Sequence, residues 1–251
     1  MRLLIISDIH ANLEALEACL DAAPEYDQVY NLGDIVGYGA NPNEVTVRSR
    51  ELGTIFVRGN HDKACSGITD LNDFNPIAGL AALWTQQQLT PENLEFLHDL
   101  PAGPIAPLDG LRLVHGSPRD EDEYVLMPRE AFYILSRIES PITFFGHTHV
   151  QGGFWIDDEA EREGRLDPKY SSRTAQQQLT VKLNPKAHYM INPGSIGQPR
   201  DGDPRAAFLL YNTEEDSITF YRVPYDIQRA QKKIISAGLP ERLALRLAEG
   251  R

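Results

Sequence analysis

The amino-acid sequence predicts an α/β protein, and two observations support this prediction. Short apolar runs recur along the chain, and their length is typical of strands that are buried on both faces of a sheet. Helical patterns lie between some of these runs, and such alternation of strand and helix is typical of an α/β sheet. The first expected strands cover residues 3–6, 29–32, 55–57, 111–114 and 142–145.

A polar cluster follows each of these expected strands. In α/β sheets ligands bind at the carboxyl ends of the strands, so the clusters are expected to gather there. In an extended segment residues i and i+2 point the same way, so two polar residues spaced in this way can reach one site. The glycines before Asp34, Asn60 and His147 are expected to permit tight turns. The clusters are Asp8-Ile9-His10, Gly33-Asp34, Gly59-Asn60-His61-Asp62, His115-Gly116 and Gly146-His147-Thr148-His149.

Local patterns predict helices between the strands. Leucines at positions 13, 16 and 20 repeat at helical spacing after Asn12, which can serve as an N-cap. A later helix is expected to begin at Thr90-Pro91, with threonine as the N-cap and proline in the first helical position. One further strand is expected at 189–191.

We expect one domain over residues 1–251. A helical insertion is predicted at about 66–101, and a charged, variable segment at about 157–178 is predicted to be a loop or a hairpin tip. Two strand-like runs after residue 202 predict a C-terminal β-hairpin. A helical tail follows from residue 226 and breaks at 238–240.

Composition excludes several functional classes. The formal net charge of -12 argues against general nucleic-acid binding and against docking on anionic membranes. The two cysteines, Cys19 and Cys65, form no disulfide framework and favour a cytoplasmic location. No apolar stretch approaches the ~20 residues of a membrane span. An acidic protein can still bind phosphate where metal ions supply the positive charge.

The polar clusters contain ligands that transition metals prefer. Carboxylates, imidazoles and an amide oxygen suit Mn, Fe, Zn, Ni or Co better than Ca or Mg. In order and content the clusters resemble the motifs of the calcineurin-like metallophosphoesterase superfamily, over roughly residues 3–200. This resemblance implies a four-layer αββα sandwich with two central sheets. It also implies two divalent metal ions as cofactors.

The resemblance also implies a role for each residue of the motifs. His61 matches the catalytic histidine, which stabilises or protonates the leaving oxygen while a hydroxide between the metals attacks phosphorus. Asp34 matches the carboxylate that bridges the two metals. The ligands of the first metal would be Asp8, His10 and His149, and those of the second Asn60, His115 and His147.

Further residues distinguish branches of the superfamily. Gly37 and Tyr38 stand where protein Ser/Thr phosphatases carry an Asp and an Arg, which weakens that assignment. Segments 8–12, 37–42 and 192–200 resemble a compact bacterial and archaeal branch of small phosphodiesterases and diadenosine-tetraphosphatase-like proteins.

Three residues outside the metal-ligand set are candidates for contact with substrate or phosphate. Asn12 is equally well explained as a helix cap, and Arg119 and Arg200 as surface residues. The insertion is expected to set substrate choice through Asp73, Asn75 or Trp84, although Trp84 is better explained by packing and the other two by helix capping.

The sequence therefore predicts a dinuclear-metal phosphodiesterase acting on a small phosphoester. The alternatives are a dinucleoside-polyphosphate hydrolase, a phosphomonoesterase or protein phosphatase, and a non-catalytic scaffold with the same fold. The presence of the full ligand set together with His61 argues against the scaffold.

Overall fold

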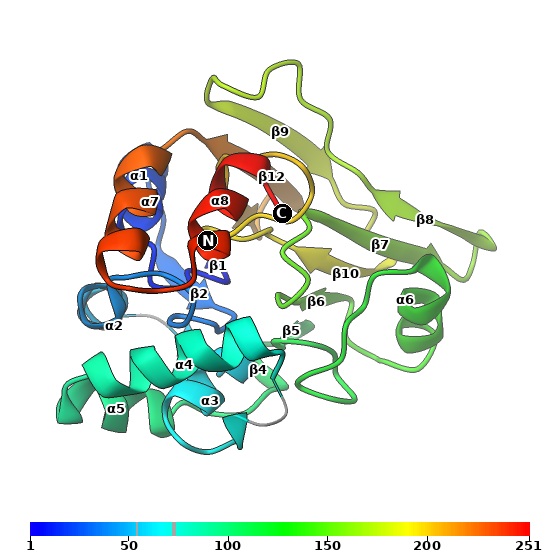
Figure 1. The fold of residues 1–251 in the computed structure, drawn as a ribbon. Helices are drawn as coiled ribbons and strands as arrows, with labels where there is room; N and C mark the ends of the chain where they lie inside the picture. Colours follow the sequence, from blue (N-terminus) through cyan, green and yellow to red (C-terminus); the bar gives the residue numbers. More distant parts are fainter. Residues whose placement is uncertain (54, 72–73) are drawn as a thin grey trace.

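Two mixed six-stranded sheets form the centre of the structure, a computed structural model that describes residues 1–53, 55–71 and 74–251 (Figure 1). The strand orders are β3-β2-β1-β11-β12-β9 and β4-β5-β6-β10-β7-β8. The strands are β1 (Arg2–Ile6), β2 (Gln28–Asn31), β3 (Ile55–Phe56), β4 (Ile105–Leu108), β5 (Leu111–Leu113), β6 (Ile142–Phe144), β7 (Gly152–Asp157), β8 (Arg162–Leu166), β9 (Gln177–Lys182), β10 (His188–Asn192), β11 (Ala206–Asn212) and β12 (Ser217–Val223). The helices are α1 (Leu13–Ala22), α2 (Pro42–Glu51), α3 (Asn60–Cys65), α4 (Pro76–Gln88), α5 (Pro91–His98), α6 (Pro128–Leu135), α7 (Ile227–Ser236) and α8 (Glu241–Glu249).

Each sheet combines a parallel group of strands with antiparallel neighbours. β1, β2 and β3 pair in parallel, whereas β11, β12 and β9 extend the same sheet in antiparallel pairing. In the second sheet β5, β6 and β10 are parallel, and β4, β7 and β8 pair antiparallel. The polar clusters follow strands of the two parallel groups, so the fold brings strand ends of the same polarity to the site.

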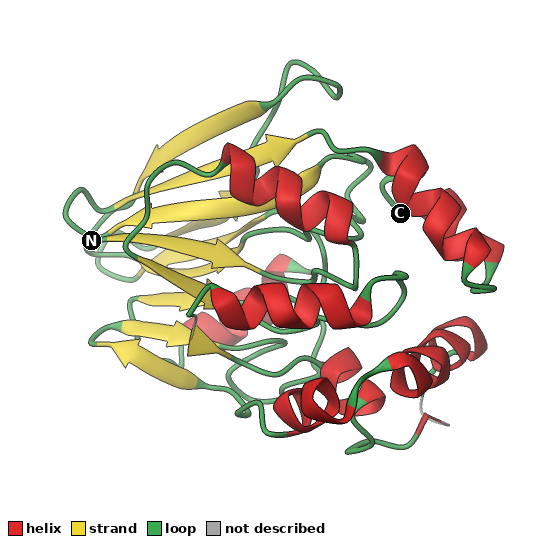
Figure 2. Cartoon of the chain, turned by 90° about the vertical axis from the view of Figure 1, so that its left-hand side faces the viewer, coloured by secondary structure: helices red, strands yellow, loops and turns green. Residues whose placement is uncertain are grey.

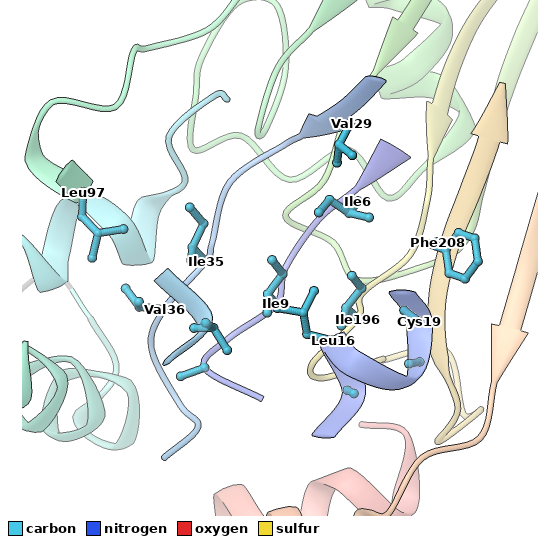
Figure 3. Packing of buried hydrophobic residues seen from close by; sticks show 14 of the residues in the cluster. Ile6, Ile9, Leu16, Cys19, Val29, Ile35, Val36, Leu97, Ile196 and Phe208 are labelled. Carbon is cyan, nitrogen blue, oxygen red and sulfur yellow. The ribbon is translucent and has the colours of Figure 1, made fainter. Parts of the chain in front are cut away.

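The two sheets pack face to face, and helices cover their outer faces. Side chains of β1 alternate between two cores, as the pleat of a strand requires. Leu3 and Ile5 face the second sheet, whereas Leu4 and Ile6 belong to the core beneath the helices, with Leu16 of α1 (Figure 3). Helix α6 packs on the outer face of the second sheet. Figure 2 shows the strands gathered on one side and most of the helices on the other. The predicted four-layer α/β architecture is therefore confirmed.

The helical insertion and the C-terminal helices pack against each other. The side chains of Asn75 and Thr90 accept hydrogen bonds from the first turns of α4 and α5, as N-caps do. The pair α7–α8 lies near α4 in Figure 1, and Leu243 and Leu247 share a core with Ala78 of the insertion. This contact places two late helices close to the polar strand ends.

Most of the expected elements are confirmed, and the differences have physical causes. The variable segment forms the hairpin β7–β8 and the start of β9, and its charged residues lie largely exposed because β8 and β9 are edge strands. The tail breaks at 238–240 as expected, but a second helix, α8, follows. Both cysteines are buried and free. Among the described residues no helix combines the length and apolarity needed to cross a membrane.

Candidate metal centre

The predicted ligands meet where the carboxyl ends of the two parallel strand groups face each other. All of them except Asn60 are at most 3% exposed. Burial of so many ionisable groups in one place is costly unless they are paired or bind metal. Asp8 and His10 follow β1, Asp34 follows β2, Asn60 opens α3 after β3, His115 follows β5, and His147 and His149 follow β6.

The ligand atoms form two groups that share one carboxylate. In each group these atoms all lie within 4.8 Å of one another. The first group is Asp8, His10, Asp34 and His149, and the second is Asp34, His115 and His147. Oδ2 of Asp34 lies 3.6 Å from Nε2 of His10 and 3.5 Å from Nε2 of His115, between the groups. The shared carboxylate is the geometry that bridging two ions requires.

The spacing of the other ligand atoms also fits metal coordination. Nε2 of His10 lies 3.1 Å from Nε2 of His149. Nε2 of His115 lies 3.1 Å from Nδ1 of His147 and 3.2 Å from Oδ1 of Asn60. Atoms bound about 2.0–2.2 Å from one ion are separated by roughly 3–3.6 Å. The amide of Asn60 therefore joins the second group.

Backbone carbonyls orient three of the imidazoles. Nδ1 of His10 lies 3.1 Å from the carbonyl of Val36, and Nδ1 of His149 lies 2.6 Å from that of Gln198. Nδ1 of His115 lies 2.7 Å from the carbonyl oxygen of Leu32, the residue that follows β2. A proton on Nδ1 leaves the lone pair of Nε2 facing the centre, which is the tautomer that binds metal.

Electrostatics give His10, His149 and Asp34 the protonation states that metal ligation requires. His115 differs, because burial is outweighed by Asp34 and Asp8, which together raise its pKa to about 10. Burial lowers the pKa of His10 and His149 well below its usual range. Burial alone would raise the pKa of Asp34, but His115, His61 and His10 together outweigh it and hold the pKa well below its usual value. Two imidazoles with free lone pairs and an ionised carboxylate are therefore present near neutral pH, as metal binding demands.

Asp8 supplies an independent sign that the site fits a cation. Burial raises its pKa to about 7. Within the described part of the chain its Oδ2 is buried and has no hydrogen-bond partner. Such an atom costs folding free energy unless something pairs with it. A divalent ion held by the first group would satisfy this oxygen, so the donor set fits the metals that the sequence predicts.

The backbone at the ligands differs from the extended form that the sequence suggested. Asp8 and His10 have φ of 53° and 48°, and His147 and His149 have φ of 64° and 59°. Asp34 is also left-handed, with φ of 54°. Left-handed backbone at such residues costs on the order of 1–3 kcal/mol each and is concentrated at functional sites. The i and i+2 side chains do converge, but through paired left-handed residues and not through a strand.

The predicted glycine turn is confirmed at Gly33, whereas Gly59 is required for a different reason. Gly33 has φ of +96° and makes the turn before Asp34. Gly59 has φ of −98°, which any residue can adopt. A Cβ on Gly59 would lie 2.1 Å from Oδ1 of Asp34, so this glycine is required by close approach to the bridging carboxylate.

His61 lies beside the metal ligands, among aromatic rings. Its ring centroid is 4.9 Å from that of His10, 4.3 Å from Tyr38 and 5.2 Å from Phe74. A Cβ on Gly37 would lie 2.6 Å from Nδ1 of His61. Packing against these rings therefore orients His61. The protein phosphatase motif carries a carboxylate at the position of Gly37, next to this ring.

The protonation state of His61 differs from the sequence-based expectation of a protonated ring. Burial, followed by the charges of Arg200 and His115, lowers its pKa to about 4, although Asp34 acts in the opposite direction. The protein's own groups therefore hold the imidazole neutral near pH 7. A phosphate anion bound beside the ring would raise the pKa again.

Asp62 does not orient His61 but braces the loop that carries the bridging carboxylate. Its Oδ2 accepts hydrogen bonds from the backbone N–H groups of Asp34 and Gly59, at 2.8 and 2.9 Å, and its Oδ1 accepts from Ile35 at 2.9 Å. The sequence placed Asp62 next to the motif but carried no signal for these long-range partners.

Two of the candidate substrate residues form contacts with other residues of the protein. Asn12 caps α1, since Oδ1 accepts from Ala15 N–H at 3.1 Å, and its Nδ2 donates to the carbonyl of Gly197 at 2.9 Å. Arg119 is exposed and forms an ion pair with Glu123. These contacts match the alternative explanations, a helix cap and a surface residue.

Arg200 lies at the site. Its Nη2 donates to Oε1 of Gln198 at 3.1 Å, and its guanidinium carbon lies 5.8 Å from the ring centroid of Tyr38. After burial, its charge is the next cause that lowers the pKa of His149. Its Nε is buried and unpaired within the described residues, which leaves a donor for an anion.

The residues of the insertion that were expected to set substrate choice lie in different surroundings. Asn75 caps α4 and also lines a cavity beside Asn60. Trp84 packs on the core that joins α4 to α7 and α8, as its packing explanation predicts. Asp73 lies outside the described residues. Tyr124, which the sequence did not single out, contacts His147, with the ring centroids 3.9 Å apart.

An ion-pair network ties the Asn60 helix to the loop after His115. Glu121 accepts hydrogen bonds from Nε and Nη2 of Arg58, both at 3.0 Å, and from Nζ of Lys63 at 2.9 Å. The ammonium of Lys63 is only 6% exposed. These contacts outweigh burial and lower the pKa of Glu121.

We expect Glu121→Gln to lower the free energy of unfolding by about 1–3 kcal/mol at neutral pH, because hydrogen bonds between charged groups are lost. A carboxyl group with a lowered pKa stabilises the fold above its unfolded pKa, and this contribution disappears as pH falls through the folded pKa. Urea unfolding should therefore show a difference near pH 7 that disappears once the pH has fallen through the lowered pKa of Glu121. Glu95→Gln, an exposed change on α5, is the control. A pH-independent difference would contradict this account.

Comparisons with known proteins agree with this geometry. A model of the calcineurin-like phosphoesterase superfamily domain matches residues 1–216. An uncharacterised protein of Methanocaldococcus jannaschii is 37% identical over 253 residues, which cover 98% of this chain and 97% of that protein. The crystal structure of a metallophosphoesterase from Sphaerobacter thermophilus has 41% identity and a TM-score of 0.85, and the match covers 100% of this chain and 99% of that one. A Pyrococcus horikoshii protein shares the fold with a TM-score of 0.78 at 22% identity, over 100% and 98% of the two chains.

Proposed function

The chain belongs to the calcineurin-like phosphoesterase superfamily, and we propose that it hydrolyses small phosphodiesters with two divalent transition-metal ions. The observation that carries this proposal is the Asp34 carboxylate, which lies between two groups of buried ligands. In the proposed assignment, Asp8, His10 and His149 hold one ion with Asp34, and Asn60, His115 and His147 hold the other.

When bound by these residues, the ions would supply a nucleophilic water near neutral pH and positive charge for the phosphoryl oxygens. His61 lies where its ring can donate a hydrogen bond to the leaving oxygen or the phosphate. Arg200 offers its buried Nε as a further donor to a phosphoryl oxygen. Asp62 holds the Asp34 loop in position through backbone hydrogen bonds.

Gly37 and Tyr38 favour this assignment over a protein phosphatase. Gly37 leaves no side chain to bond Nδ1 of His61, and Tyr38 packs on the ring where an arginine would be required. Arg200 reaches the same tyrosine from another loop, with Nη2 3.5 Å from its hydroxyl. The positive charge for phosphate therefore comes from a different segment of the chain.

Metal removal and a substrate panel test the proposal. Protein stripped with a chelator should lose hydrolysis of a chromogenic phosphodiester, and Mn²⁺ or a similar ion should restore it. Diesters, monoesters and dinucleoside polyphosphates should be compared with several metals, and we expect the highest kcat/KM with diesters. A higher kcat/KM with dinucleoside polyphosphates would instead favour a phosphoanhydride hydrolase. No hydrolysis of any phosphoester with any divalent ion would favour the scaffold.

A further inference from the structure

A cavity of about 310 Å³ adjoins the second ligand group, and aromatic side chains form much of its lining. Asn60 and His147 line one part of it. Tyr38, Phe74 and Tyr124 also line it, together with His61, Lys63, Asp122 and smaller residues. Binding pockets for small organic ligands begin at about this size. The cavity therefore has room for a group attached to a phosphate that the site holds.

The aromatic rings are arranged in two sets beside the site. In the first set His61 lies between Tyr38 and Phe74, with centroid distances of 4.3 and 5.2 Å. In the second set the rings of Tyr124 and His147 are tilted by 38°, with centroids 3.9 Å apart. In the first set Tyr38 comes from the Asp34 loop, His61 from α3 and Phe74 from the insertion. In the second set Tyr124 comes from the segment after His115 and His147 from the loop after β6. Separate segments of the chain thus contribute aromatic rings to one cavity.

Charge in this cavity is largely neutralised. Apart from histidines and tyrosines, its ionisable residues are Lys63 and Asp122. They pair with each other, with Nζ of Lys63 2.6 Å from Oδ2 of Asp122. An ion pair of this kind leaves no net charge to attract a second phosphate. The lining therefore suits an uncharged planar group.

The exposure of Tyr124 supports a binding role for its ring. It remains 49% exposed although its ring contacts a candidate metal ligand. Exposed aromatic surface in a concave site is available for stacking with a ligand. Stacking of a base on an aromatic ring increases affinity roughly 5- to 150-fold and tolerates different bases.

We propose that this cavity binds a planar aromatic group of the substrate, so that the preferred phosphoester is one that carries a nucleobase or a comparable ring. The proposal rests on the proposed function, because it concerns what is attached to the phosphate at the same site. Tyr124 and Phe74 act as specificity residues, since their rings contact the aromatic group and not the phosphorus.

Binding tests the proposal without turnover. Calorimetry on Mn²⁺-loaded protein should compare adenosine 5′-monophosphate with ribose 5-phosphate, which have the same phosphate and sugar and differ in the base. We expect about tenfold tighter binding of the nucleotide. Tyr124→Leu and Phe74→Leu should each reduce this preference severalfold, measured as the ratio of the two affinities within each variant. Tyr133→Leu is the matched control, because Tyr133 is 48% exposed but lies on α6, with its ring against Arg137.

Hydrolysis of the two corresponding methyl diesters separates this proposal from the proposed function. The scissile bonds are the same, so a higher kcat/KM with the nucleoside ester measures recognition of the base. If neither ester is hydrolysed but the binding preference exists and depends on Tyr124, the phosphodiesterase assignment fails and the aromatic site stands. If both esters are hydrolysed equally and the two monophosphates bind equally, the aromatic site is wrong and the phosphodiesterase assignment stands.

Discussion

Asp34→Asn is expected to lower kcat/KM more than about a hundredfold and to reduce the metal content of both sites. Even partners outside the ligand set change metal affinity or activity by about 10- to 100-fold, and Asp34 belongs to both ligand groups. Its Oδ2 lies 3.5–3.6 Å from two imidazole nitrogens that belong to different groups. Its Oδ1 accepts the backbone N–H of His61 at 2.8 Å. An amide would provide one acceptor where two are used and would remove the negative charge.

Metal analysis by mass spectrometry, together with kcat/KM, measures this effect. Asp157→Asn is a suitable control, because Asp157 is a 7% exposed aspartate outside both ligand groups, with hydrogen bonds from Ala160 and Asn184. The control should keep two ions per chain. Loss of one ion alone in Asp34→Asn would show that Asp34 binds a single metal and does not bridge.

His61→Ala is expected to lower kcat by about 10²–10⁴-fold and to leave the metal content near that of the wild type. His61 is 3% exposed, but the two groups of mutually close ligand atoms are formed without it. Its ring contacts Tyr38 and Phe74, so removal leaves a small space beside the cavity and does not remove a ligand.

Turnover and metal content measured on the same preparation test this role. His98→Ala, at a 58% exposed side chain on α5, should behave like the wild type. Partial rescue of His61→Ala by added imidazole would support a role in proton transfer or hydrogen bonding. Equal loss of metal and activity would make His61 a ligand, and unchanged kcat would exclude it from the reaction.

Strands that are buried on both faces were predictable because their signal is local. β1, β2, β5, β6 and β10 appear in the sequence as apolar runs, and each lies in a parallel group. β8 and β9 were not predicted, because edge strands tolerate charged residues and lose the apolar pattern. Helix α2 was missed for a related reason, since it is polar and carries Arg48 and Arg50 in its last turn.

The sequence alone determined which side chains are available for the site and the order in which the strands present them. Asp8, Asp34 and His115 follow local apolar runs, so their strand-end positions could be inferred without any distance. Only the tertiary structure decided how these positions meet. No local pattern in the sequence indicates the left-handed backbone at the ligands, and the Asp62 hydrogen bonds join residues 28 positions apart. The aromatic cavity likewise needs Tyr38, Phe74 and Tyr124 from separate segments, and packing between segments leaves no local pattern in the sequence.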